Sequence, residues 1–218
     1  GVSHAAALIT FLTFVGWMLV AWRLARALAG PRLAWLAAGL LLVIPGWYGA
    51  DLVFRTAEPF LNARTPAEVA CLGAILAFIR GRRFLAVSLL AVATAFHPIM
   101  AFPAALLLAS LSIWRREILF FWPVAAIAIC VGAIAGAFVL GGNSALMSDN
   151  WLGMTRTRSG FLFLQNWGTA SWQANAVSVL TVLLASQLLD RWPKRLATAA
   201  FWIAACGLAL AALASTVL

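Results

Sequence analysis

The sequence predicts an all-α fold, a polytopic transmembrane bundle of about eight membrane helices that includes a short helical hairpin over residues 84–114. The 218 residues are 65% hydrophobic and only 10% charged, whereas a soluble domain is about half apolar and a quarter charged. The mean hydropathy is +1.01. Apolar segments long enough for membrane helices recur along the whole chain. We therefore expect a single transmembrane domain over residues 1–218.

The apolar segments follow one another between short polar or basic intervals. We expect membrane helices over Ala5–Trp22, Leu33–Tyr48, Ala67–Ile79, two parts of Phe84–Trp114, Ile118–Leu140, Ala174–Leu189 and Leu196–Leu218. The intervals 49–66 and 141–173 are predicted to be non-cytoplasmic loops. At the end of the first loop we expect Thr65 to cap the next helix, with Pro66 at its first helical position and Glu68 in its first turn.

The run Phe84–Trp114 decides the topology. Its 31 residues, as one helix, would extend about 46 Å, whereas the hydrocarbon core is about 30 Å thick. Pro98 removes a backbone donor and disfavours a helical conformation at His97, near the middle of the run. Two short helices that meet at a turn are therefore one interpretation, and a single kinked helix is the other.

The basic residues separate these two interpretations. The hairpin places eleven Lys and Arg residues on one side of the membrane and four on the other, whereas the single helix divides them eight to seven. Because positive residues collect in cytoplasmic loops, the hairpin is favoured. It puts the N-terminus outside the cytoplasm. On the cytoplasmic side it places Arg23, Arg26, Arg32, Arg80, Arg82, Arg83, Arg115, Arg116, Arg191, Lys194 and Arg195.

The same topology gathers unusual polar residues on the non-cytoplasmic face. Arg156 and Arg158 stand on the side that is poor in positive charge, so a lipid phosphate is a plausible partner for their guanidinium groups. A pair of interfacial arginines that reach toward water is the alternative. Arg55 and Arg64 are further candidates for phosphate binding, although a solvated loop with weak ion pairs also explains them.

His97 is the remaining phosphate-binding candidate, because ionisable groups at membrane depth often serve function. Its alternative role is to satisfy the broken backbone at the turn. Asp51, Glu58 and Asp149 are candidates for lining the same polar site. No catalytic residue can be assigned from these positions alone.

Several other functions are disfavoured. The net charge of +9 comes from loops beside apolar spans and so does not indicate nucleic-acid binding. The three cysteines lie in apolar runs without metal-ligand spacing, so no metal site is predicted. The sequence contains no nucleophile elbow, phosphate-binding loop, dinucleotide fingerprint or metalloprotease motif. No cofactor is evident from these patterns, a divalent metal stays open, and membrane lipids are the expected partners.

The order of the segments resembles one group of membrane enzymes. "RLARALAGPRLAWLAAGLLLVIPGW" is similar to the second membrane segment of GT-C-type glycosyltransferases, and "TPAEVACLGAILAFIRGRR" is similar to the helix that follows it. "RFLAVSLLAVATAFHPIMAFPAALLLASLSIWRR" resembles their next pair of short helices. "MSDNWLGMTRTRSGFLFLQNWGTASW" resembles an outer loop of bacterial members. The resemblance covers nearly the whole chain and depends on order and spacing.

This resemblance implies an enzyme of the bacterial inner membrane and cell envelope that transfers a sugar from a polyprenyl-phosphate carrier at the non-cytoplasmic face. Its catalytic acidic residue lies in the first outer loop of the family, which would precede Gly1. We therefore expect a fragment of a larger protein that holds the scaffold and part of the lipid-phosphate pocket. The alternatives are a fragment of a transporter or lipid flippase and a non-catalytic membrane scaffold subunit.

Overall fold

The computed structural model describes residues 2–43, 46–48, 54–55, 60, 62–140, 153–154, 157, 166–188 and 191–217. Its helices are α1 (Val2–Val43), α2 (Arg64–Ile79), α3 (Arg83–Phe96), α4 (Pro98–Arg115), α5 (Ile118–Leu140), α8 (Thr169–Leu188) and α9 (Arg191–Val217). Strands β1 (Trp47–Tyr48) and β2 (Phe54–Arg55) form one short antiparallel pair. The described part of the chain is therefore helical apart from this pair, which confirms the predicted all-α class.

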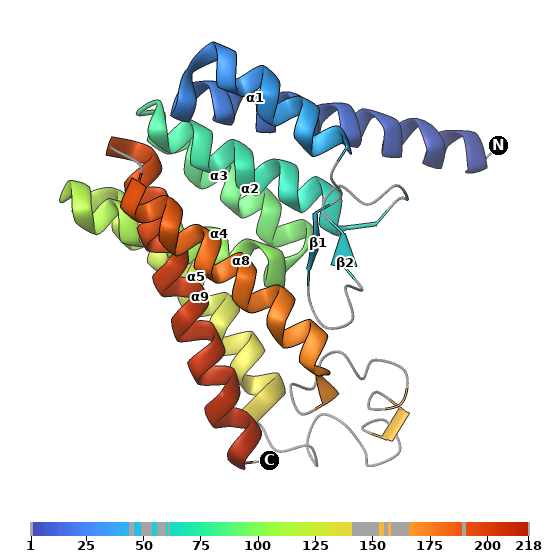
Figure 1. The fold of residues 1–218 in the computed structure, drawn as a ribbon, viewed down its shortest axis with the longest axis vertical. Helices are drawn as coiled ribbons and strands as arrows, with labels where there is room; N and C mark the ends of the chain where they lie inside the picture. The colour runs from blue at the N-terminus through green and yellow to red at the C-terminus, as the bar shows by residue number, and fades with distance from the viewer. Residues whose placement is uncertain are drawn as a thin grey trace.

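Helix α1 reverses direction at Gly30. This glycine has φ 85° and ψ 173°, a conformation open mainly to glycine, and Pro31 follows it. The rings of Trp22 and Trp35 lie 5.3 Å apart, although thirteen residues of straight helix would separate them by about 20 Å. Figure 1 shows the two arms side by side. With the arms counted separately, the described residues form eight helical segments, and the prediction that about eight helices cross a membrane stays a prediction.

The run Phe84–Trp114 is a hairpin, as predicted. Helix α3 ends at Phe96, His97 is extended with φ −156° and ψ 93°, and α4 begins at Pro98. Arg83, at the start of α3, forms an ion pair with Glu117, just beyond the end of α4. The two ends of the run therefore lie together, which a single helix of this length could not achieve.

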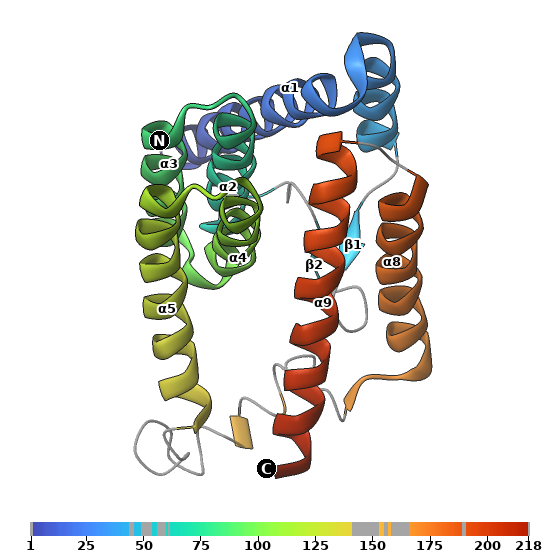
Figure 2. The ribbon, with the colours of Figure 1, turned by 90° about the vertical axis from the view of Figure 1, so that its left-hand side faces the viewer.

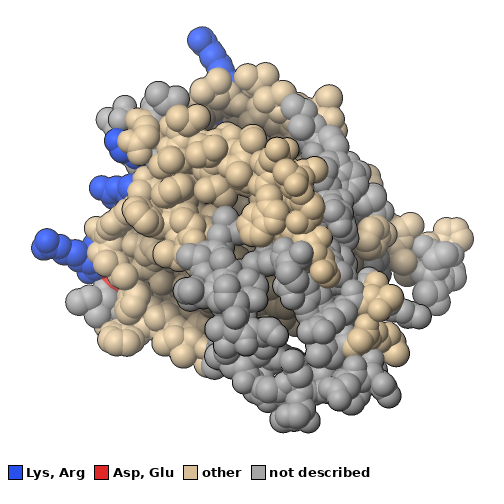
Figure 3. Space-filling model, turned by 60° about the horizontal axis from the view of Figure 1, so that its bottom comes forward, with Lys and Arg blue, Asp and Glu red and all other residues tan. Residues whose placement is uncertain are grey.

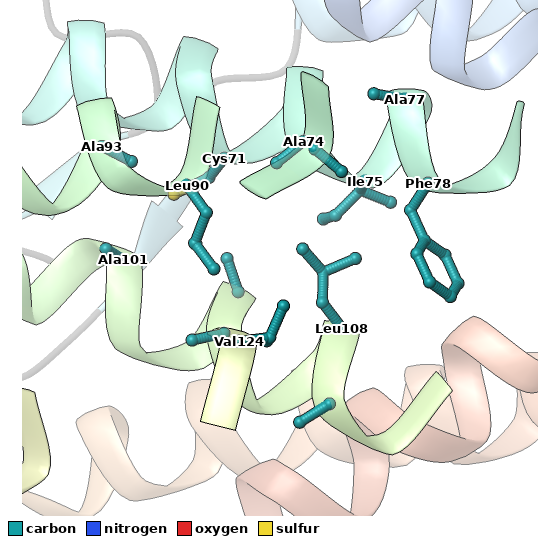
Figure 4. Close-up of a cluster of buried hydrophobic side chains, with 14 of the residues drawn as sticks. Cys71, Ala74, Ile75, Ala77, Phe78, Leu90, Ala93, Ala101, Leu108 and Val124 are labelled. Carbon is teal, nitrogen blue, oxygen red and sulfur yellow. The ribbon is translucent and has the colours of Figure 1, made fainter. Parts of the chain in front are cut away.

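Small residues let the central helices approach closely. The core lies between α2, α3, α4 and α5, and Figure 4 shows its side chains meeting between these helices. Its largest fully buried apolar side chains are Phe78, Leu90, Leu108, Leu111 and Val124. The same core contains alanines without exposed surface: Ala74, Ala86, Ala93, Ala101 and Ala105. Close packing of small residues is typical of helix interfaces in membranes.

Two further packing units complete the bundle. The first arm of α1 lies along α2, where Trp17 and Ala21 pack against Val69 and Leu72. Helices α8 and α9 form an antiparallel pair, and α9 contacts α4 and α1. Figure 2 shows this pair beside the central helices. Helices α1 and α4 are long and apolar enough to cross a membrane, by the length and composition of the described residues.

The connections rich in arginine share one end of the bundle, which we call the basic end. The reversal of α1, the α2–α3 turn, the α4–α5 turn and the start of α9 all lie on the left of Figure 1. Basic side chains also project toward this side in Figure 3. The basic end holds Arg23, Arg26, Arg32, Arg80, Arg82, Arg83, Arg115, Arg116, Arg191, Lys194 and Arg195. The grouping predicted from the hairpin is therefore present in the fold.

Several predicted boundaries were wrong near prolines. The helix predicted over Leu33–Tyr48 ends at Val43, and Trp47 and Tyr48 belong to β1. Pro45 explains the early end, because helices usually stop at or before the residue that precedes a proline. Helix α9 begins at Arg191 and not at Leu196. Pro193 is compatible with this start, since proline is tolerated in the first helical turn.

The starts of α2 and α8 also differ from the predictions. Thr65 lies inside α2, which begins at Arg64, so Thr65 is not its cap and the loop 49–66 is shorter than predicted. The Asn62 side chain takes the capping role, because its Oδ1 accepts from the backbone nitrogens of Arg64 at 2.8 Å and Thr65 at 3.0 Å. Helix α8 begins at Thr169, inside the predicted loop 141–173.

Candidate functional site

The structure describes only part of the predicted polar site. Arg64 and His97 are described with their side chains, and Arg55 is described by its place in β2. The other predicted site residues lie outside the described residues: Asp51, Glu58, Asp149, Arg156 and Arg158. Their assignments therefore remain predictions.

His97 organises the turn between α3 and α4. Its backbone nitrogen donates to the Ala93 carbonyl at 2.8 Å, and its own carbonyl accepts from the nitrogens of Met100 and Ala101, each at 3.1 Å. Its Nδ1 also accepts from the Met100 nitrogen at 3.3 Å. The residue thus ends one helix and caps the next. This is the structural role that the sequence offered as the alternative to substrate contact.

A sulfur contact joins this turn to the neighbouring helix. The buried Cys71 Sγ lies 3.6 Å from the Met100 carbonyl oxygen and is placed to donate to it. Cys71 lies two turns beyond Arg64 in α2. The α3–α4 turn and the first half of α2 therefore lie at the same end of the bundle, opposite the basic end. Arg64 and His97 share this end, as the predicted topology requires.

Arg55 is placed by the short strand pair. Its Cα lies opposite that of Trp47, and Phe54 lies opposite Tyr48. The strand pair follows α1 and precedes α2 in the chain. Arg55 thus belongs to the connection that joins these two helices at the end opposite the basic end. The pairing itself has no signal in the sequence, since each strand has only two residues.

No metal centre is found in the described part of the chain. Its His, Cys, Asp and Glu side chains form no group of three or more that could hold an ion. Among the described acids, Glu117 binds Arg83 and Arg115 at the basic end. The other described acid, Glu68, lies in the first half of α2 with Arg64, so the described residues at the predicted site supply a carboxylate as well as cationic and hydrogen-bonding groups.

A cavity that sequence reasoning missed lies at the basic end. It has a volume of about 560 Å³ and is lined by Trp22, Arg23, Arg26, Ala27 and Arg80. The first four residues come from the first arm of α1, and Arg80 follows α2. The signal for it is the cluster Trp22, Arg23 and Arg26 on one helix. Only the packing of α1 on α2 adds Arg80.

Neither a family model, nor a curated protein, nor a solved structure matches this chain.

Proposed function

We propose that this chain is an integral membrane protein whose basic end faces the cytoplasm. The distribution of charge supports the orientation, because eleven of the fifteen Lys and Arg residues of the chain lie at the basic end. The first arm of α1 and α2 run in the same direction, since Gly16 lies beside Val69 and Arg23 shares a cavity with Arg80. The N-terminus then lies on the non-cytoplasmic side.

Exposed apolar side chains support insertion in a bilayer. The described part of α1 buries only Trp17, Ala21, Ala34 and Ala38, although both of its arms are rich in apolar residues. Leu119 is 93% exposed and Phe84 is 88% exposed. A water-soluble protein seldom exposes this much contiguous apolar surface. Lipid tails would cover these faces without any change in the fold.

The helix hydroxyl groups agree with this environment. Thr10, Thr13, Thr94 and Ser110 each donate to the carbonyl four residues earlier in the same helix. Such bonds satisfy a hydroxyl inside its own helix, so it needs no water. Side chains that satisfy themselves in this way fit a helix bundle in lipid, where an unpaired polar group is costly.

We propose further that the bundle is the scaffold of a GT-C-type glycosyltransferase in a bacterial inner membrane. In this proposal it transfers a sugar from a polyprenyl-phosphate carrier at the non-cytoplasmic face. The observation that carries it is the short hairpin of α3 and α4, which turns at His97 beside the start of α2. Such a turn at the end opposite the basic end brings cationic and hydrogen-bonding groups to the face where the carrier phosphate would lie.

Each predicted site residue has a role in this proposal. Arg156 and Arg158 are the first candidates to bind the carrier phosphate, because a guanidinium group matches phosphate oxygens and would stabilise the charge of the leaving group. Further candidates with the same role are Arg55, Arg64 and His97. The candidates for lining the polar site are Asp51, Glu58 and Asp149.

The experiment compares two double variants of the full-length protein in a transfer assay with a polyprenyl-linked sugar. R156A/R158A is expected to lower transfer at least tenfold, because removing a charge-stabilising donor commonly has an effect of this size. The matched control R82A/R116A removes the same charge at the basic end and is expected to keep wild-type transfer. Equal transfer by both variants would refute the phosphate role of Arg156 and Arg158.

The same assay separates the competing functions. Flipping of a lipid-linked sugar without transfer would indicate a flippase, to which the broken helix at His97 is also suited. If neither transfer nor flipping is detected with the full-length protein and its lipid substrate, a scaffold subunit is the better interpretation.

A further inference from the structure

The cavity at the basic end has the features of an anion site. Three guanidinium groups, from Arg23, Arg26 and Arg80, line it together with the indole of Trp22. In the part of the chain that the structure describes, none of these arginines forms an ion pair. Positive charges that lie close together repel one another, so a bound anion would stabilise their arrangement.

The indole of Trp22 supplies a second, independent observation. Its Nε1 is buried and has no hydrogen-bond partner among the described residues. Buried donors of this kind are almost always satisfied, since leaving one unpaired costs about 1–3 kcal/mol. An acceptor from outside the chain would satisfy it. The same kind of ligand would therefore satisfy the arginines and the indole: a group with negative charge and several acceptor oxygens.

The aromatic setting places this ligand at the membrane surface. Trp22 packs against Trp35, which is 68% exposed, with ring centroids 5.3 Å apart. The Arg26 guanidinium lies 5.5 Å from the centre of the Trp22 ring. Tryptophans and arginines together are typical of the level of lipid headgroups. Exposed apolar side chains of α1, such as Leu33 and Leu36, lie close by in the sequence and would contact acyl chains.

Glu117, the described acid of the basic end, binds arginines outside the cavity. Glu117 is held by Arg83, with Nη2 to Oε1 at 2.6 Å, and by Arg115, with Nε to Oε1 at 2.9 Å. Among the described residues, the carboxylate of the basic end therefore binds Arg83 and Arg115 and not the three arginines of the cavity. A phosphate diester fits this need, because guanidinium groups bind phosphate oxygens in pairs.

We infer that this cavity binds the phosphate headgroup of an anionic phospholipid in the cytoplasmic leaflet. Basic pockets between membrane helices on this side are suited to such headgroups. The bound lipid would join the reversal of α1 to the end of α2 and so stabilise the first arm of α1 on the bundle. This inference rests on the proposed membrane insertion and does not depend on sugar transfer.

The test measures how many phosphatidylglycerol molecules the full-length protein retains after extraction from vesicles of phosphatidylglycerol and phosphatidylcholine in equal parts. Native mass spectrometry counts the bound lipid. R23Q/R26Q/R80Q is expected to lower phosphatidylglycerol retention at least about tenfold, since each basic residue near an anionic surface contributes substantially to binding. The matched control R82Q/R116Q/K194Q removes the same charge from exposed positions outside the cavity and is expected to retain the lipid.

A second variant tests the indole without changing any charge. W22F keeps the aromatic ring but removes the Nε1–H donor, and it is expected to lower retention about fivefold. Equal retention by wild type, the cavity triple variant and W22F would overturn the inference. Equal losses in the cavity triple and the control triple would also overturn it, because they would indicate a diffuse surface charge.

Inorganic phosphate distinguishes the two sources of the same chemistry. Added phosphate is expected to leave the bound phosphatidylglycerol in place, because the acyl chains also contribute to binding. Displacement of the lipid by inorganic phosphate would assign the cavity to a free anion instead. Membrane fractionation of each variant is measured in parallel, and a wild-type protein found outside the membrane would refute the insertion on which both proposals rest.

Discussion

His97 combines two backbone roles within one residue. Its carbonyl accepts the first backbone hydrogen bonds of α4, and its Nδ1 caps the same helix by accepting from the Met100 nitrogen. Pro98 at the first position of α4 has no N–H that needs a partner, and His97 Nδ1 accepts from the Met100 N–H in the same first turn. The residue therefore stabilises the turn between α3 and α4, independently of any contact it makes at the proposed site.

The first prediction separates these roles. H97A is expected to lower stability by about 1 kcal/mol through loss of the cap, whereas H97N is expected to restore most of it, because asparagine is a strong N-cap residue. The measurement is the apparent Tm of the purified protein in detergent. If H97N is as unstable as H97A, the cap does not explain the residue. If H97N is stable but inactive in transfer, the imidazole contributes to the proposed site.

A second residue-scale network closes the basic end of the core. The Arg83 guanidinium donates to the Phe78 carbonyl and to Glu117, and it lies 4.1 Å from the centre of the Phe78 ring. The Phe78 ring in turn lies 5.0 Å from that of Phe120. One arginine thus joins α2, α3 and the α4–α5 turn. A sequence pattern would have assigned it to the general positive charge of a cytoplasmic loop.

At the scale of elements, α2 packs closely against α3 at Gly73. A Cβ at this position would lie 3.2 Å from Cδ1 of Leu89, whereas one at Gly39 of α1 would meet nothing within 4 Å. The absence of a side chain at Gly73 therefore lets Leu89 of α3 pack directly against α2. Because α3 begins the hairpin, this contact also sets the position of the turn at His97.

The second prediction tests this contact. G73L is expected to lower stability by about 1–3 kcal/mol, because a larger side chain forces the two helices apart. The matched control G39L is expected to be neutral or slightly stabilising, since leucine is a better helix former than glycine. Apparent Tm values in detergent give the comparison. The double variant G73L/L89A should recover part of the loss, and a failure to do so would argue against direct contact.

At the scale of the whole molecule, the orientation of the bundle in a membrane depends on which end holds the arginine-rich connections between helices. The basic end collects the reversal of α1, the α2–α3 turn, the α4–α5 turn and the start of α9. The turn at His97 and the start of α2 lie at the other end. If the basic end is cytoplasmic, the proposed transfer site faces outward and the proposed phospholipid site faces inward.

The third prediction concerns this orientation. In a background where the three cysteines are replaced by alanine, single cysteines at Arg82 and Lys194 are expected to react with an impermeant maleimide from the cytoplasmic side only. Cysteines at Ala95 and Ile99 are expected to react only from the opposite side, since both positions are exposed near the hairpin turn. Cytoplasmic labelling at Ala95 or Ile99 would contradict the orientation and place the predicted site on the wrong face.

Much of the helical layout could be predicted from local pattern. The segment Ile118–Leu140 has the predicted bounds, and the hairpin follows from a long apolar run, Pro98 and the arginines at its ends. Boundaries failed where a single residue decides them. Asn62 caps α2 in place of Thr65, because capping depends on where the chain turns before the helix.

The candidate site was less accessible to sequence reasoning. The sequence could assign Arg64 and His97 to one face, because alternating helices place successive loops on alternate sides of a membrane. It could not pair Arg80 with Arg23 and Arg26, which lie more than fifty positions earlier. Such a pairing depends on which helix faces pack together, and hydrophobic segments that are apolar on all sides do not encode that choice in their periodicity.

The sequence by itself determined the all-α class, the hairpin of α3 and α4 and the separation of charge between two ends, because these depend on segment length, proline and arginine placement along the chain. Only the tertiary structure decided that Arg83 joins three elements, that Gly73 sets the α2–α3 contact and that Trp22 lies with three arginines around one cavity. Those features come from side chains far apart in sequence. Their contacts exist only after close packing of small residues has chosen the neighbours of each helix.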